Sequence, residues 1–129
     1  MDPIKHKIIF CDTCIIIDYL KSKKDIIEIF SKIGYEKLYI NSIVTMELYQ
    51  GAISKKELIK IKKNLKKFTL LEIEQNILSY ATELMENFNL SHNLKIPDAI
   101  IAATCLIYEI ILFTYNRKDF MYMPNLKLY

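Results

Sequence analysis

The chain has 129 residues and a formal net charge of +3, and 52% of its residues are hydrophobic. A chain of this length can bury one core but not two, so residues 1–129 are expected to form a single domain. The sequence contains no Ser-, Gly- or Pro-rich tract, which argues against a linker or a disordered tail, and its mild positive charge allows a polyanionic partner without requiring one.

The apolar segments do not have the form of export or membrane signals. Residues 8–11 are too short for the core of a secretory signal peptide. Residues 99–115 are interrupted by Glu109 and fall short of a spanning helix of roughly 20 residues. Three cysteines are an odd count for disulfide pairing, so free thiols are expected. The chain is therefore predicted to be cytoplasmic and to have no membrane contact.

The first half of the chain alternates between strand and helix patterns. Residues 7–11 predict a buried strand, and Asp12 follows it as a candidate helix N-cap. Further elements are expected as helices over 13–20 and 25–33 and as a strand over 38–40. Residues 41–51 then predict a short helix with Ser42 as its N-cap. Glu47 lies inside that helix. It is either an exposed helix former, as most glutamates are, or an acid in an unusual setting, because its apolar neighbours favour burial.

The second half continues the alternation. A capping box at residues 54–57 begins a lysine-rich helix, and the later patterns predict a strand at 69–73, a helix at 74–90, a helix beginning near Pro97, a strand at 110–114 and an edge strand at 126–129. Pro97 places Asp98 in the first turn of its helix. His92 falls in a predicted polar loop without a ligand-spaced partner, so it is expected to be exposed.

Strands that alternate with helices predict a parallel sheet, and ligands of such sheets gather at the carboxyl ends of the strands. Asp12, Glu47, Asn116 and Asp119 each follow a predicted strand, and Asp98 begins the helix that leads into the last one. Clustered carboxylates raise one another's pKa unless a cation neutralises them. Oxygen ligands favour Mg²⁺ or Mn²⁺, and such an ion suits phosphodiester hydrolysis. Each acid also has an ordinary structural explanation as a cap or a surface residue.

Four motifs occur together in a characteristic order: IIFCDTCIIIDYL, INSIVTMELYQGA, IPDAIIAATCL and ILFTYNRKDFMYMPNLKL. With these motifs the chain resembles PIN-domain proteins, most closely the small VapC-type toxins of toxin–antitoxin pairs. The resemblance implies an α/β fold with three α/β/α layers around a central parallel sheet. It also implies a Mg²⁺- or Mn²⁺-dependent endoribonuclease that acts on RNA.

The resemblance assigns roles to individual residues. By motif position, Asp12, Glu47 and Asp98 correspond to the acidic metal ligands of the family. The fourth position falls on Asn116 or on Asp119, where family members carry Asp or Asn, or an acid slightly later. The natural partners implied are a small antitoxin that blocks the cleft and a second copy of the chain.

Neighbouring residues are expected to support the acids. Thr13 and Thr114 are predicted to hold the acids or the substrate phosphate, and Arg117, Lys118 and the lysine-rich helix are candidate phosphate contacts. Cys14 stands where the family commonly has Asn. A thiol lacks the two-sided hydrogen bonding of an amide, which puts a local bracing contact in question.

Two alternatives from other classes stay open at this point. A receiver-like phospho-signalling domain would also have an acid after its first strand, although Glu47 inside a helix does not match it. The other alternative is a PIN-like fold that binds a partner without catalysis.

Overall fold

The computed structural model describes residues 7–129, in which four strands form one parallel sheet ordered β3-β2-β1-β4. The strands are β1 (Ile9–Cys11), β2 (Leu38–Asn41), β3 (Thr69–Leu71) and β4 (Ile111–Phe113). The helices of this region are α1 (Thr13–Leu20), α2 (Lys24–Ile33), α3 (Ser42–Gln50), α4 (Lys55–Leu65), α5 (Gln75–His92) and α6 (Ile96–Tyr108), with short 3₁₀ turns η2 (Tyr35–Lys37) and η3 (Arg117–Asp119).

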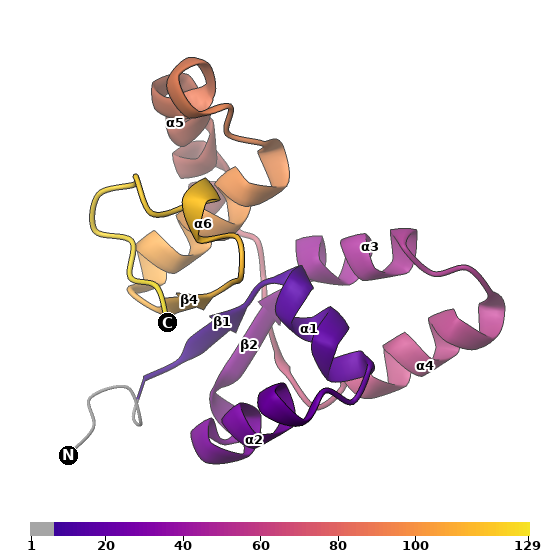
Figure 1. Cartoon of the computed structure of the whole chain (residues 1–129). Helices are drawn as coiled ribbons and strands as arrows, with labels where there is room; N and C mark the ends of the chain where they lie inside the picture. The colour runs from indigo at the N-terminus through magenta and orange to yellow at the C-terminus, as the bar shows by residue number, and fades with distance from the viewer. Residues whose placement is uncertain (1–6) are drawn as a thin grey trace.

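The helices lie in layers on both sides of the sheet. Figure 1 shows α1 and α2 on one side, α5 and α6 on the other, and α3 and α4 as a helical hairpin beside α1. The chain steps from β1 to β2 to β3 in one direction and then returns through α5 and α6 to β4 at the opposite edge. Right-handed crossovers in opposite directions place their helices on opposite faces. The predicted three-layer α/β/α fold is therefore confirmed.

The order of the strands reverses between β1 and β4, which pair in parallel with Phe10 opposite Leu112. The ladder continues one residue beyond β1, because the backbone amide of Asp12 donates to the carbonyl of Phe113 at 2.9 Å. In open α/β sheets this reversal creates the crevice in which ligands bind, at the carboxyl ends of the strands. Asp12 lies at that point of the fold.

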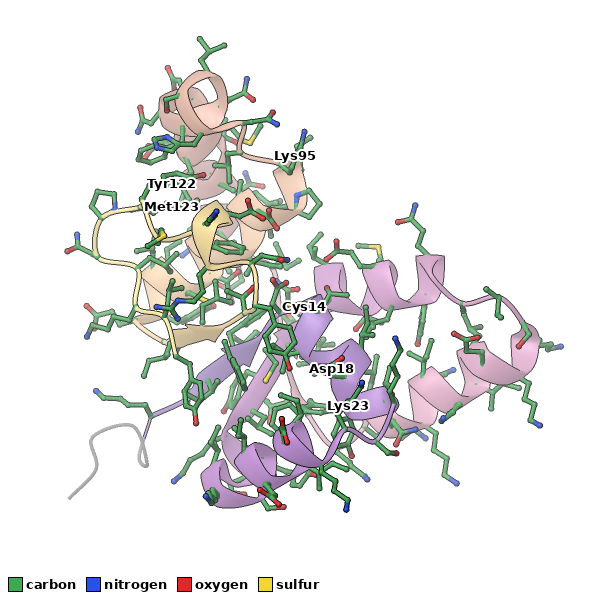
Figure 2. The ribbon with its side chains drawn as sticks, viewed as in Figure 1. Cys14, Asp18, Lys23, Lys95, Tyr122 and Met123 are labelled. Carbon is green, nitrogen blue, oxygen red and sulfur yellow. The ribbon has the colours of Figure 1, made fainter. Side chains whose placement is uncertain are left out.

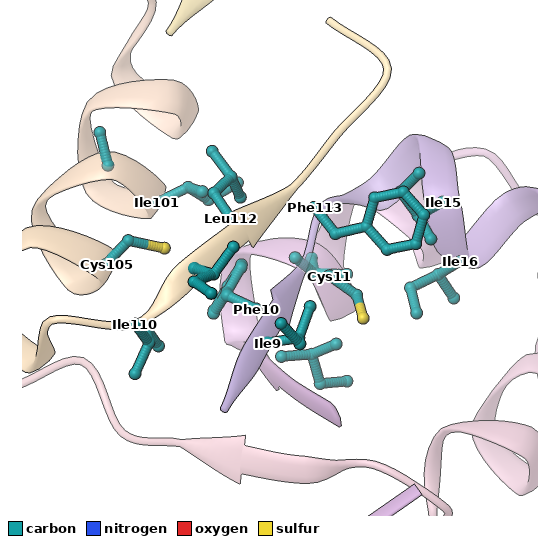
Figure 3. Close-up of a cluster of buried hydrophobic side chains, with 14 of the residues drawn as sticks. Ile9, Phe10, Cys11, Ile15, Ile16, Ile101, Cys105, Ile110, Leu112 and Phe113 are labelled. Carbon is teal, nitrogen blue, oxygen red and sulfur yellow. The ribbon is translucent and has the colours of Figure 1, made fainter. Parts of the chain in front are cut away.

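The core surrounds β1, whose three residues are 0% exposed. Figure 3 shows Ile101 and Cys105 of α6 beside Leu112 on one side of the sheet and Ile15 and Ile16 of α1 on the other. The three thiols are unpaired, as expected. A strand buried on both faces explains why residues 9–11 are apolar without alternation.

Two helix ends close to the acids differ from the prediction. Asn41, not Ser42, is the N-cap of α3: its backbone is extended and its side-chain oxygen accepts from the amide of Val44 at 3.2 Å. Ser42 is the first helical residue and is exposed. His92 belongs to the last turn of α5, because the helix ends only at Asn93, which takes a left-handed conformation with φ 53°. The predicted polar loop therefore begins at residue 93.

The predicted edge strand at residues 126–129 is wrong. This segment forms only a bridge between Leu112 and Leu128, in which Leu112 donates to the carbonyl of Lys127 and Tyr129 donates to that of Leu112. The chain reaches it through Asn125 at φ 67°, so the segment meets β4 over a single residue. Within residues 7–129 no helix combines the length and apolar character that crossing a membrane requires.

Replacing Asn41 with Ala should lower the free energy of unfolding by about 1 kcal/mol, the usual cost of losing an N-cap side chain. Urea denaturation followed by circular dichroism measures this change. Ser42→Ala is the matched control and should change the value by less than about 0.5 kcal/mol, because the residue is exposed. Equal losses in the two variants would contradict the assignment of the cap.

Candidate active site

Asp12 is buried at the end of β1, with 5% of its surface exposed, and both of its carboxylate oxygens are hydrogen-bonded. Oδ1 accepts from the amide of Thr13 at 2.8 Å, which is the expected capping contact. Oδ2 accepts from the hydroxyl of Thr114 at 2.7 Å. The bond from Thr114 joins the ends of β1 and β4, so the sheet itself fixes the position of the carboxylate.

Glu47 lies on α3 and is also held by a threonine. Its Oε1 accepts from the hydroxyl of Thr13 at 2.8 Å, a contact between residues 34 positions apart. Thr13 therefore donates its amide to Asp12 and its hydroxyl to Glu47. The expectation that Thr13 and Thr114 contact the acids is confirmed, and α1 and α3 are thereby connected at the edge of the site.

Cys14 lies in the first turn of α1, beside the segment that follows β4 (Figure 2). Its sulfur accepts from the amide of Tyr115 at 3.4 Å and lies 3.9 Å from Oδ2 of Asp12. Burial is the largest cause that raises the pKa of this thiol, and Asp12 raises it further. A protonated thiol can donate weakly to the carboxylate. Cys14 thus braces the segment after β4 in spite of lacking an amide.

Asp98 is in the first turn of α6 and shows that the acids share one electrostatic environment. Its pKa is raised to about 7, first by burial and then by the charges of Asp12, Asp119 and Glu47, in that order. A helix N-terminus favours a carboxylate, but here burial and like charges outweigh that effect. Four acids from separate segments of the chain therefore contribute to one region of negative potential.

Asp119 and Asn116, the two candidates for the fourth position, differ in their contacts. Asp119 is exposed at the end of η3 and lines a cavity of about 150 Å³ together with Asp98. Asn116 is exposed, and its backbone amide donates to the hydroxyl of Thr114 at 3.0 Å. In the described part of the chain its side chain makes no hydrogen bond. The charge of Asp119 acts on Asp98, and the choice between Asp119 and Asn116 stays a prediction.

The donor set suits a hard divalent cation, because it consists of carboxylate oxygens supported by hydroxyl groups. Across residues 7–129, however, no three acidic, histidine or cysteine side chains already converge as ligands of one ion. Mg²⁺ usually keeps several waters and binds through one or two carboxylates, so this spacing remains compatible with such a site. Asp12, Glu47, Asp98 and Asp119 are the residues that could hold the ion.

Two further surfaces adjoin the acids. A groove of about 790 Å³ lies between α1, α3 and α4, and its lining includes Glu47, Lys56, Lys60 and Lys63. The 150 Å³ cavity beside Asp98 includes His92 and Tyr122. Sequence reasoning left His92 as an exposed loop residue and gave Tyr122 no role. No local pattern joins these two residues, because only the packing of α5 against the C-terminal segment brings them together.

The raised pKa of Asp98 predicts how stability depends on pH. The folded chain binds this proton up to about pH 7, whereas the unfolded chain releases it near the ordinary value of 3.8. Stability is therefore lost as pH rises between these values. Asp98→Asn should lose less unfolding free energy than the wild type as pH rises from about 4 to about 7, measured by urea denaturation.

The matched control for this measurement is Glu86→Gln, which neutralises an exposed acid on α5. It should follow the wild type over the same pH range. An Asp98→Asn variant with the pH dependence of the wild type would contradict the burial of an uncompensated carboxyl at this position.

Comparison with solved structures identifies similar folds that match nearly whole chains. A toxin–antitoxin complex from Klebsiella pneumoniae is 28% identical with a TM-score of 0.75, covering 91% of this chain and 93% of that chain. DNA-bound VapBC from Salmonella typhimurium is 18% identical with a TM-score of 0.83, covering 95% and 97%. VapBC2 from Rickettsia felis, bound to a promoter DNA fragment, is 22% identical with a TM-score of 0.75, covering 95% and 97%.

A search of curated proteins finds no match. The PIN domain family model, in contrast, matches residues 9–124, which include the four acids and the whole sheet. This match favours the PIN-like fold over the receiver-like alternative, in agreement with the position of Glu47 inside α3. The chain belongs to the PIN domain family.

Proposed function

We propose that this PIN-domain protein is a Mg²⁺- or Mn²⁺-dependent endoribonuclease that acts in the cytoplasm as the toxin of a type II toxin–antitoxin pair. The observation that carries the proposal is the placement of acids at the reversal point of the sheet: Thr13 joins Asp12 to Glu47, and the charges of Asp12, Asp119 and Glu47 add to burial in raising the pKa of Asp98 to about 7. Uncompensated carboxylates cost stability. Binding of a cation that neutralises these carboxylates would explain why the chain places them close together.

Asp12, Glu47, Asp98 and Asp119 would hold the cation, with Asn116 as an alternative oxygen donor. When bound, such an ion polarises a water molecule and stabilises the charge that develops on a phosphate. The side chains of this protein would position the water molecule and take up its proton. A carboxylate at the reversal point can accept a proton from a water molecule and hold that water in position for attack.

The threonines would act as positioning residues. Thr114 and Thr13 hold the carboxylates of Asp12 and Glu47 through hydrogen bonds of 2.7 and 2.8 Å. Residues that orient metal ligands commonly affect metal affinity and activity although they do not touch the metal. The hydroxyl of Thr114 also accepts the amide of Asn116, so one side chain orders both the acid and the start of η3.

Basic side chains near the acids would bind the RNA backbone. Lys56, Lys60 and Lys63 line the groove that begins at Glu47, and the exposed Lys118 lies in η3 between Arg117 and Asp119. Arg117 is partly committed, because its guanidinium donates to the carbonyl of Tyr129 at 2.9 Å. Lysine contacts of this kind give affinity without base preference and weaken with salt.

The proposed protein partner is an antitoxin. The support is the complex from Klebsiella pneumoniae, which is a toxin–antitoxin assembly and matches 91% of this chain at 28% identity. In the proposal the antitoxin covers the acidic cleft and keeps RNA away from it. A homodimer of this chain remains a prediction from family resemblance.

The second candidate function is a PIN-like binding module without catalysis. The observation in its favour is that, in the described residues, no three potential ligands converge on one point. This candidate predicts RNA or protein binding with no turnover. Cleavage measured with added metal separates the two functions.

Purified protein should cleave single-stranded RNA in the presence of Mn²⁺ and should stop when EDTA is added. Asp98→Asn and Glu47→Gln should each reduce the rate by at least about a hundredfold, because each removes a carboxylate from the proposed site. The measurement is gel analysis of a labelled RNA of mixed sequence. Glu86→Gln is the control and should cleave like the wild type, since Glu86 is an exposed residue of α5. Equal rates for Asp98→Asn and wild type would refute the assignment.

Thr114→Val should reduce cleavage about 10- to 100-fold and raise the Mn²⁺ concentration needed for half-maximal rate, because the hydroxyl that orients Asp12 is lost. Rates measured across a Mn²⁺ titration test this. Thr82→Val is the matched control, because the hydroxyl of Thr82 only donates to the carbonyl of Leu78 on the exposed face of α5. If Thr114→Val left the Mn²⁺ dependence unchanged, the positioning role would be wrong.

A further inference from the structure

The segment that follows β4 carries both candidates for the fourth position of the acidic site, and little of it is buried. Thr114 is 4% exposed and Phe120 is 0% exposed, whereas residues 115–119 between them are all exposed. We call residues 115–119 the η3 segment. An exposed stretch with few contacts belongs to the least stable part of a fold. The contacts that hold this segment therefore decide how well Asn116 and Asp119 are placed.

Tyr115 attaches the η3 segment to α1 at two points. Its backbone amide donates to the sulfur of Cys14 at 3.4 Å, and its phenol donates to Oδ2 of Asp18 at 2.9 Å. Cys14 and Asp18 are four positions apart in α1, so they lie on one face of the helix and about 6 Å apart along its axis. Figure 2 labels both residues on α1. The backbone and the side chain of a single tyrosine thus span one turn of the helix.

The phenol of Tyr115 is well suited to hold this contact. Its pKa is raised to about 12, first by burial and then by the hydrogen bond to Asp18, so the hydroxyl keeps its proton at neutral pH and remains a donor. Hydrogen bonds to a charged acceptor are stronger than those between neutral groups. The ring also packs edge-on against Phe113 at the end of β4, with ring centres 6.4 Å apart. These contacts restrict the side chain although half of its surface is exposed.

The same contacts lead directly to the buried acid. The sulfur of Cys14 lies 3.7 Å from the hydroxyl of Thr114 and 3.9 Å from Oδ2 of Asp12. The hydroxyl of Thr114 donates to Asp12 and accepts the amide of Asn116. A displacement of Tyr115 would therefore move the residues on either side of it, the threonine that orients Asp12 and the start of η3.

We propose that Tyr115 is a positioning residue: through Cys14 and Asp18 it clamps the η3 segment to α1 and thereby fixes the fourth position of the cation site relative to Asp12. The inference rests on the proposed nuclease function and adds to it a residue that contacts none of the four acids. It also gives Cys14 a task that a thiol can perform, because the sulfur needs only to accept the amide of Tyr115.

Alkylation of Cys14 reports whether the clamp is closed. Cys11 and Cys105 are buried and Cys14 is only partly so, so iodoacetamide should reach Cys14 first, as followed by mass spectrometry of its peptide. Tyr115→Phe should raise the alkylation rate of Cys14 about fivefold, because loss of a hydrogen bond to a charged group favours local opening. Tyr108→Phe changes an exposed tyrosine at the end of α6 and is the matched control, with the rate of the wild type.

Variants of Asp18 separate the hydrogen bond from the charge. Asp18→Asn keeps an acceptor oxygen and should stay within about twofold of the wild-type alkylation rate, whereas Asp18→Ala should match Tyr115→Phe. The double variant Tyr115→Phe/Asp18→Ala should react no faster than either single variant, because both changes remove the same bond. Additive increases in rate, or an Asp18→Asn variant as fast as Asp18→Ala, would overturn the clamp.

The positioning role is measured without turnover, by titrating Mn²⁺ into the folded protein and following the free ion by electron paramagnetic resonance. Tyr115→Phe should weaken Mn²⁺ binding about tenfold, as expected for a residue that orients metal ligands, and Tyr108→Phe should not. A merely structural contact would lower the free energy of unfolding in urea and leave the Mn²⁺ affinity of the folded protein unchanged. That result would refute the positioning role.

The outcomes separate this inference from the nuclease proposal. If Tyr115→Phe keeps the alkylation rate and the Mn²⁺ affinity of the wild type, the clamp is refuted, and Mn²⁺-dependent cleavage by the wild type would still support the nuclease. If the wild type neither binds Mn²⁺ nor cleaves RNA, the nuclease proposal fails and the positioning role fails with it. Non-additive alkylation rates would in that case still support the attachment of the η3 segment to α1.

Discussion

The structure depends on one buried carboxylate, that of Asp12, held where the sheet changes direction. Its two oxygens accept from the amide of Thr13 and the hydroxyl of Thr114, a residue 102 positions away. Because β1 is buried on both faces, its carboxyl end is rigid, and a side chain that follows it is placed with the precision of the sheet. Glu47 on α3, Asp98 in the first turn of α6 and Asp119 in η3 are the acids placed near this fixed point.

The acids work against the stability of the fold that positions them. Burial and three neighbouring carboxylates raise the pKa of Asp98 to about 7, so near neutral pH the folded state is penalised for ionising it. Threonine hydroxyls and the Cys14 thiol offset part of this repulsion, although none of them brings a positive charge. Local conflicts of this kind are typical of functional sites. A cation or a basic group of a partner would neutralise these carboxylates and remove the repulsion between them.

Much of the fold could be predicted because the local patterns agree with the tertiary structure. The buried strand before Asp12, the helix that contains Glu47 and the helix that begins near Pro97 all occur where their patterns place them. Errors arose where two neighbouring residues compete. Asn41 and Ser42 are both good caps, and only the extended backbone at Asn41 decides between them. Residues 126–129 have a strand-like composition, but the turn at Asn125 lets them meet β4 at one residue only.

The sequence by itself determined the alternation of strands and helices, the placement of acids after strands, and the family motifs, because these depend on short-range periodicity and order along the chain. Only the tertiary structure decided which side chains meet. It ties Thr13 to Glu47, brings the charge of Asp119 near Asp98, and stacks His92 on Tyr122. Such contacts join distant segments whose packing depends on the reversal of strand order, and local sequence patterns do not record that geometry.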